Sequence, residues 1–329
     1  MSTSGHTRIL GIGSYGPERV VNNNQLSNTV ETSDEWIRTR TGIQERRFAS
    51  DEQATSDLSL EAAKKAMEDA KVLPEEIDLV LVATITPDMA FPSTACILQE
   101  KLKLKKNVFT LDIPFGCSGY VYGLFNSFLI SSNMKGKGLL LCGDMSSKFI
   151  NMKDEKYFGL FGDAGSATAI EFTKDKKFDT PFSFGADGKG FNNLIYKSDG
   201  FNNSTNVFLE MEGPKIFEFA IEEVPKQIND LLKKSKHREK DLNYCILHQA
   251  NKFLVESILK KTKISNDKNL MSIQKFGNTN SASIPVTILN NKDKVKNSKI
   301  IISGFGVGYS WASAIISLEK IKITNLLKL

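Results

Sequence analysis

Short runs of apolar residues alternate with amphipathic stretches along most of the 329-residue chain. Several of these runs have the length and the β-branched content of buried strands. The predicted strands are Thr7–Ile12, Leu79–Thr84, Val108–Ile113, Gly138–Cys142, Ala167–Glu171, Tyr244–Leu247, Lys299–Ser303 and Ser313–Leu318. Buried strands that alternate with helices are typical of a layered α/β protein.

The stretches between these runs carry apolar residues at helical spacing. Thr55–Lys71 opens with candidate capping residues and places small or apolar side chains, from Leu58 to Ala70, on one face. The other predicted helices are Ser93–Leu102, Cys117–Met134, Gly213–Lys234 and Lys252–Lys261.

Two parts of the chain resemble each other faintly. The matching segments are GLLLCGDM (138–145) with KIIISGFG (299–306), and FGDAGSATAIE (161–171) with YSWASAIISLE (309–319). We expect two similar halves that meet near residue 175, which gives domains 1–175 and 176–329.

The composition is that of an ordinary soluble globular protein, with 25% charged residues and a net charge of +5. Lysines cluster in short segments such as KLKLKK (101–106) without interleaved aromatic residues. This pattern argues against a nucleic-acid partner. The N-terminal segment lacks the layout of a signal peptide, and no apolar run reaches the roughly 20 residues that a bilayer span requires. We therefore expect a cytoplasmic enzyme without membrane insertion.

The segment GIGSYG (11–16) matches the pattern G-x-G-x-x-G of dinucleotide-binding proteins. That site requires a helix to begin at the glycines, because the helix N-terminus holds the pyrophosphate. Here the residues that follow, PERVVNN, indicate a turn and extended chain instead. We interpret the segment as a structural turn.

One of the four cysteines stands apart from the others. Cys96, Cys142 and Cys245 lie in apolar strings, and none of the four has metal-ligand spacing. Cys117 lies between two glycines in FGCSG, where a predicted strand gives way to a predicted helix. A helix N-terminus favours the thiolate and offers free N–H groups to an oxyanion. Cys117 is thus either a buried thiol or a nucleophile.

A catalytic cysteine needs polar partners, and the chain has only three histidines. His248 follows the predicted strand YCIL, where its side chain is as often structural as functional. Asn278 lies in FGNTNSASIP (276–285), which is either a helix-capping loop or a source of an amide donor. GFGVG (304–308) either allows close backbone packing or presents bare N–H groups to a reacting carbonyl.

Together these segments resemble the β-ketoacyl-[acyl-carrier-protein] synthase III family of the thiolase superfamily. The motifs that carry the resemblance are SDEWIRTRTGIQERR (33–47), AFPSTACILQEKL (90–102), GCSGYVYGL (116–124), LFGDAGSATAI (160–170), LHQAN (247–251), GNTNSASIP (277–285) and GFGVGYSWASAII (304–316). They span nearly the whole chain in the family's order. The resemblance implies a thiolase-like, five-layered αβαβα fold made of two similar halves, and a homodimer.

The resemblance also assigns the chemistry. Cys117 corresponds to the acyl-accepting nucleophile, with His248 and Asn278 completing a Cys-His-Asn triad. The backbone N–H groups of Cys117 and Val307 correspond to the oxyanion donors. In this family an acyl group moves from a thioester to the cysteine, and a malonyl thioester on acyl carrier protein then loses carbon dioxide and attacks it. This chemistry needs no metal or redox cofactor.

Further positions follow from the resemblance alone. The residues that match the coenzyme A site are Trp36, Arg40 and Thr41. Those that match the acyl pocket are Phe91, which reaches across the dimer, Phe115, Met211 and Phe305. Lys252, Lys260 and Lys261 match the docking face for the carrier protein. Phe253 departs from the family, which usually has an arginine there.

Two other functions stay open at this point. One is a thiolase-fold acyltransferase that passes the Cys117 acyl group to an amine or hydroxyl without forming a carbon–carbon bond. The other is a non-catalytic acyl-binding subunit. The sequence leaves open the length and branching of the primer, and whether coenzyme A or a carrier protein delivers it. It also leaves open whether the pathway is fatty-acid initiation or a specialised one.

Overall fold

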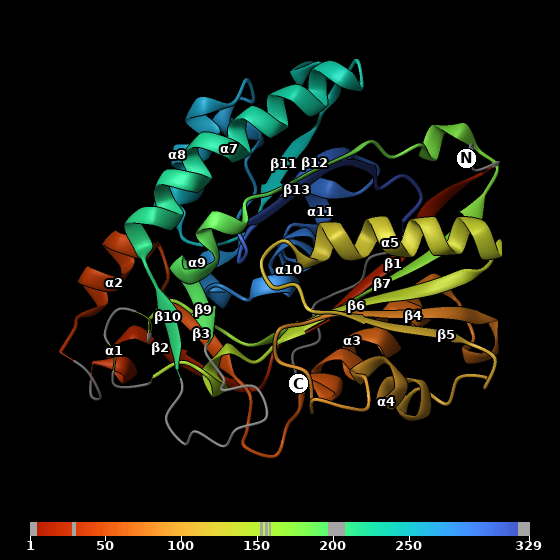
Figure 1. Ribbon diagram of the computed structural model, residues 1–329, viewed down its shortest axis with the longest axis horizontal. Coiled ribbons are helices and arrows are strands. Elements are labelled where there is room, and N and C mark those ends of the chain that lie inside the picture. The colour runs from red at the N-terminus through yellow and green to blue at the C-terminus, as the bar shows by residue number, and fades with distance from the viewer. Residues whose placement is uncertain are drawn as a thin grey trace.

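The computed structural model describes residues 5–27, 31–151, 154, 157, 159–196 and 208–321. The two larger β-sheets and three layers of helices alternate in it, as Figure 1 shows from α7 and α8 on one side to α3 and α4 on the other. This arrangement confirms the predicted αβαβα architecture.

The N-terminal sheet has the strand order β1-β7-β6-β4-β5. Its strands are β1 (His6–Tyr15), β4 (Ile77–Ala83), β5 (Phe109–Ile113), β6 (Lys137–Asp144) and β7 (Ala164–Thr173). β4 runs parallel to both β5 and β6, whereas β7 is antiparallel to its two neighbours.

The C-terminal sheet repeats this topology with the order β11-β12-β13-β8. Its strands are β8 (Phe182–Ala186), β11 (Tyr244–Leu247), β12 (Lys299–Gly306) and β13 (Ser310–Ser317). β11 is parallel to β12, and β13 is antiparallel to β12 and β8, which makes β8, β13, β12 and β11 the counterparts of β1, β7, β6 and β4. The faint internal similarity of the sequence thus corresponds to equivalent strands, and the boundary near residue 175 stays a prediction.

Two helices fill the space between the sheets, namely α5 (Gly119–Met134) and α10 (Ser283–Asn290). The central core joins Leu81 of β4, Leu124 of α5, Ile288 of α10 and Ile302 of β12, all with no exposed surface. Burial of this kind contributes about 1.5–3 kcal/mol for each large apolar side chain. The middle layer therefore fixes the two sheets, and the segments at their edges, relative to each other.

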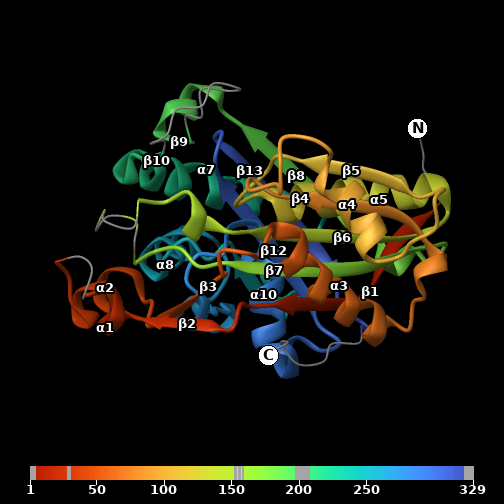
Figure 2. The same cartoon turned by 90° about the horizontal axis from the view of Figure 1, so that it is seen from below.

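The outer layers cover the remaining faces of the sheets. α3 (Thr55–Ala70) and α4 (Thr94–Lys101) pack on the N-terminal sheet, and α7 (Gly213–Lys234) and α8 (Lys252–Lys261) on the C-terminal one. Smaller elements gather at one end of the molecule (Figures 1 and 2). They are β2 (Arg19–Asn22), α1 (Asn23–Leu26), α2 (Asp34–Thr41), β3 (Glu45–Phe48), β9 (Leu194–Tyr196), β10 (Leu209–Met211) and α9 (Ile273–Phe276). The short helix α11 (Lys292–Val295) lies away from this end.

The predicted strands and helices are all present, with ends that differ by a few residues. The interpretation of GIGSYG as a turn is wrong, because Gly11 and Gly13 lie inside β1 and pair with β7. A side chain at Gly13 would collide with the carbonyl oxygen of Ala62 in α3. These glycines therefore allow α3 to lie directly on the strand.

Within the described ranges, none of the helices combines the length and the apolar character that crossing a bilayer requires.

Candidate active site

Cys117 lies between the end of β5 and the start of α5, with Ser118 at the N-cap position of the helix. Strand β12 passes directly beside it. A Cβ atom at Gly306 would lie 2.9 Å from the Cys117 sulfur, and one at Gly304 would lie 2.7 Å from the Cys117 carbonyl oxygen. Both glycines are therefore required by the close approach of β12 to the cysteine.

Strand β11 delivers His248 to the same place. The His248 backbone N–H donates to the Ser303 carbonyl of β12 at 2.8 Å, and the imidazole Nδ1 lies 2.7 Å from Ser283 Oγ. The ring of Phe305 packs edge-on against the imidazole, with centroids 5.6 Å apart. Burial lowers the pKa of His248 to about 3, although a hydrogen bond to the Asn280 backbone opposes the shift. The imidazole is therefore neutral at neutral pH.

Asn278 belongs to the loop between α9 and α10. Its backbone bridges to the neighbouring segment, donating to the Leu160 carbonyl at 2.9 Å and accepting from the Gly162 N–H at 3.0 Å. Its side-chain Oδ1 accepts from the Asn280 N–H at 3.0 Å. This contact fixes which way the amide faces and leaves its N–H donors available to a substrate.

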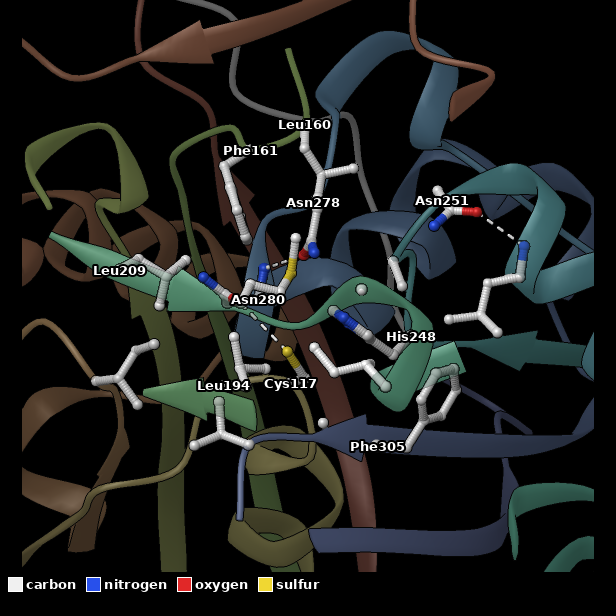
Figure 3. Close-up of a pocket in the computed structure, with 18 of the residues that line it drawn as sticks. Cys117, Leu160, Phe161, Leu194, Leu209, His248, Asn251, Asn278, Asn280 and Phe305 are labelled. Atoms are coloured by element: carbon white, nitrogen blue, oxygen red, sulfur yellow. Dashed lines mark hydrogen bonds between the residues drawn. The ribbon is translucent and has the colours of Figure 1, made fainter. Parts of the chain in front are cut away.

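These three side chains line one cavity of about 280 Å³, shown in Figure 3. Its polar end holds Cys117, His248, Asn278 and Asn280, and the other walls are almost entirely apolar. The other lining residues are Ile85, Phe149, Leu160, Phe161, Leu194, Leu209, Met211, Gly213, Ile216, Phe217, Ala250, Asn251, Leu254, Phe305, Gly306 and Val307. An apolar cavity with a few convergent polar groups is the usual form of a small-molecule site.

The environment of Cys117 determines its protonation. Burial raises the pKa of the Cys117 thiol to about 12, and the nearby carboxylate of Asp144 contributes to the increase. The backbone N–H groups of Cys117 and Val307 hydrogen-bond to the sulfur and oppose it. Burial outweighs the helix N-terminus expected to assist ionisation, so the cysteine rests as a thiol.

Asp144 is a buried carboxylate at the end of β6 that the sequence did not single out. It accepts hydrogen bonds from Thr84 Oγ1 at 3.1 Å, from the Ile85 N–H at 2.9 Å and from the Ser281 N–H at 3.0 Å. Burial raises the pKa of Asp144 to about 6, and these hydrogen bonds limit the increase. Asp144 thereby ties the loop of Asn278 to the strand ends beside Cys117.

The residues that match a coenzyme A site lie on α2, outside the lining of the cavity. Trp36 is 49% exposed, and the guanidinium carbon of Arg40 lies 6.0 Å from the centre of its ring. Thr41 donates to the Ile37 carbonyl at 2.7 Å. Helix α2 lies against α8, where a Cβ atom at Gly42 would be 2.6 Å from that of Lys252.

The structure separates the residues assigned to the acyl pocket. Met211 and Phe305 line the cavity, whereas Phe91 and Phe115 do not. Phe91 is 75% exposed, and Phe115 stacks on Tyr122 with ring centroids 4.3 Å apart. The three lysines assigned to carrier docking, Lys252, Lys260 and Lys261, are exposed on α8.

Two residues of the loop and helix at 277–290 were missed as individuals, although the motif GNTNSASIP contains them. Asn280 accepts a hydrogen bond from the Cys117 thiol at 3.3 Å, and Ser283 contacts His248. In the sequence, small polar residues in front of an apolar helix indicate only a helix cap. Their role at the candidate active site becomes visible only from their distances to Cys117 and His248 in the structure.

Family models match two segments of the chain. The model described as 3-oxoacyl-[acyl-carrier-protein] synthase III matches residues 111–188, and that of its C-terminal part matches residues 232–318. A β-ketoacyl-[acyl-carrier-protein] synthase III from Caldanaerobacter subterraneus is 39% identical over 95% of this chain and 98% of its own length. One from Clostridium tetani is 39% identical over 94% and 97%.

Solved structures agree with these matches. A 3-oxoacyl-[acyl-carrier-protein] synthase III superposes with a TM-score of 0.91, at 32% identity over 95% of this chain and 99% of its own. That of Aquifex aeolicus has a TM-score of 0.88, at 33% identity over 94% and 99%.

The fold and the site thus define an acyl-transferring condensing enzyme of the thiolase fold, as predicted, which the comparisons support over the two alternatives. More narrowly, the chain belongs to the β-ketoacyl-[acyl-carrier-protein] synthase III family.

Proposed function

We propose that Cys117 accepts an acyl group from a thioester donor and passes it to a malonyl thioester on acyl carrier protein. In the first half, the bond between the Cys117 sulfur and the acyl carbon forms while the carbon–sulfur bond of the donor breaks. The thiol proton ends on the departing thiol. The N–H groups of Cys117 and Val307 are suited to the oxyanion that develops on the acyl oxygen.

In the second half, the malonyl group loses carbon dioxide, and the electron pair of the broken bond forms an enolate. The enolate carbon then attacks the acyl carbonyl, the bond to the Cys117 sulfur breaks, and the sulfur regains a proton from solvent. Asn278 and the neutral His248 are placed to donate hydrogen bonds to the enolate oxygen. One such donor is typically worth about 3–4 kcal/mol in the transition state.

A single observation carries this proposal. A thiol, an imidazole, a side-chain amide and two backbone N–H groups meet at the polar end of one apolar cavity. The apolar walls suit an acyl chain.

The proposed partners are acyl-CoA and acyl carrier protein. The exposed Trp36 on α2, with Arg40 beside it, offers a surface for an adenine base. The exposed lysines of the neighbouring α8 would attract an acidic carrier protein. The chemistry uses only groups of the chain and of its substrates, so we propose no resident metal or redox cofactor.

A homodimer is also proposed. In the described part of the chain, β5 pairs with β4 on one side and with no strand on the other. Phe109 of this strand is exposed, and so are Leu129 of α5 and Phe91, which precedes α4. An unpaired strand edge with exposed apolar side chains favours association. A cytoplasmic location is proposed as well.

The test is a condensation assay with purified protein, acyl-CoA of several lengths and malonyl-loaded carrier protein. A β-ketoacyl carrier protein and carbon dioxide in equal amounts are expected. Transfer of the acyl group to an added amine or alcohol without release of carbon dioxide would instead favour the simple acyltransferase. Neither product, from protein that is folded and pure, would contradict the proposal.

A further inference from the structure

Asn280 contacts the nucleophile through its side chain. The Cys117 thiol donates a hydrogen bond to Asn280 Oδ1, with the sulfur and oxygen 3.3 Å apart (Figure 3). Both residues are buried, with 6% of Cys117 and 3% of Asn280 exposed, and both line the polar end of the cavity. We infer that Asn280 is a positioning residue that holds the Cys117 thiol in a fixed orientation for acyl transfer.

The other arm of the amide is anchored. Asn280 Nδ2 donates to the hydroxyl of Ser146 at 2.6 Å, and Ser146 is buried in the turn that follows β6. The Nδ2 end of the amide is thus held by Ser146, while the Oδ1 end faces the Cys117 sulfur. Ser146 anchors the Asn280 side chain on the side away from Cys117.

The backbone of Asn280 reaches the other two catalytic groups. Its N–H donates to Asn278 Oδ1 at 3.0 Å, and its backbone hydrogen-bonds to the His248 imidazole. Asn280 has φ = +45°, in the left-handed region where asparagine is one of the better tolerated residues with a side chain. This conformation allows one residue to contact Cys117, His248 and Asn278 together.

The contact suits a nucleophile that rests as a thiol. The hydrogen bond to Asn280 fixes the direction of the S–H bond, and with it the orientation of the sulfur for acyl transfer. The hydrogen bond also disappears on acylation, because the acyl-enzyme has no thiol hydrogen. This role rests on the proposed function, and it concerns the first transfer, onto Cys117, rather than the decarboxylation.

The test compares Asn280→Gly with Ser146→Ala and with a matched control. Glycine at position 280 removes the amide and still accepts the left-handed backbone. The control is Asn297→Gly, since Asn297 is also an asparagine with positive φ (+57°) but lies on the surface between α11 and β12. All four proteins would first be compared by thermal unfolding.

Two readouts follow. The S–H stretching band of Cys117, isolated by infrared difference against Cys117→Ala, reports the hydrogen bond directly. The rate of acylation by acyl-CoA, followed by intact-protein mass, reports whether this hydrogen bond assists acyl transfer. In Asn280→Gly we expect the S–H band to move to higher frequency. The acylation rate at saturating acyl-CoA should fall about tenfold, as for one lost hydrogen bond, whereas the acyl-CoA concentration that gives half of that rate should not change. Ser146→Ala should show a smaller change of the same kind, and Asn297→Gly none.

An S–H band that is the same in wild type and Asn280→Gly would overturn the inference, whatever the kinetics. Wild-type acylation rates in Asn280→Gly would also overturn it. If the wild-type protein itself accepts no acyl group, the proposed function fails, and the infrared band alone still decides whether Asn280 holds the thiol.

Discussion

The hydroxyl oxygen of Ser283 lies 2.7 Å from Nδ1 of His248, and both side chains are buried. The hydroxyl pairs a ring nitrogen that would otherwise have no partner and fixes the orientation of the ring. Ser283→Ala is therefore expected to lower the condensation rate about tenfold, as for one lost hydrogen bond at a buried group. Acylation of Cys117 should change little, since it is the malonyl half that uses His248.

The control for this variant is Ser131→Ala, which removes a buried hydroxyl that donates to the Gly136 carbonyl at 2.7 Å outside the site. Steady-state condensation and single-turnover acylation would be measured for both variants. A loss confined to the acylation step of Ser283→Ala would contradict the role given to His248.

Gly306→Ala should abolish or nearly abolish acylation of Cys117. The new Cβ atom would lie 2.8 Å from the Cys117 Cβ and 2.9 Å from its sulfur, so the thiol must move from its position beside the backbone N–H groups. A displacement of about 1 Å commonly costs about a hundredfold in rate. Gly188→Ala is the control, because a Cβ atom there meets nothing within 4 Å. Wild-type acylation by Gly306→Ala would show that β12 does not constrain the nucleophile.

The pH dependence of Cys117 alkylation follows from its raised pKa of about 12. Only the thiolate reacts with iodoacetamide, and its fraction below the pKa rises about tenfold for each pH unit. The alkylation rate of Cys117, corrected with Cys117→Ala for the other cysteines, should therefore keep rising between about pH 7 and pH 10. A plateau that begins near pH 7 would mean that the resting nucleophile is a thiolate.

Ile85 is expected to influence the length of the acyl primer. Its side chain lines the cavity that contains Cys117, and a Cβ atom at the adjacent Gly116 would lie 3.2 Å from Ile85 Cδ1. Ile85→Ala removes part of this wall and enlarges the cavity. Each additional methylene of the primer that is buried there contributes about 0.8 kcal/mol, or about fourfold in kcat/KM. Competition between acyl-CoAs should show a shift toward longer primers, with Ile130→Ala on α5 as the control. An unchanged order of preference would place the acyl chain elsewhere.

The lysine pair at the end of α8 should affect the carrier substrate and not the chemistry. Replacing Lys260 and Lys261 together by Glu reverses the charge of an exposed surface, so the KM for malonyl carrier protein should rise about tenfold at low salt. The difference should shrink in 0.5 M salt, where screening is stronger. The same charge reversal at Lys103 and Lys106 is the control. An equal increase in KM there would mean that the effect comes from the net charge of the protein and not from a docking site on α8.

The sequence predicts the layers because buried strands and amphipathic helices leave local patterns. It also indicates Cys117, since glycines on both sides of a cysteine at a strand–helix junction are a local feature. The misinterpretation of GIGSYG has a physical reason. Two glycines in a strand can mark a turn or make room for a helix, and only the position of α3 distinguishes these cases.

Relations across the chain are harder to predict. Asp144 and Ser281 form a hydrogen bond although they are 137 positions apart, and Asn280 meets Cys117 across 163 positions. Each of these residues has an ordinary local explanation, as the end of a strand or the cap of a helix. Their roles arise only when the middle layer of α5 and α10 brings the two halves together.

The most direct test of the central claim is the mass of the intact protein after incubation with acyl-CoAs of several lengths. The proposed mechanism predicts one added acyl group per chain, absent in Cys117→Ala and removed on addition of malonyl carrier protein. An adduct that persists in Cys117→Ala, or no adduct from either acyl-CoA or acyl carrier protein, would contradict it.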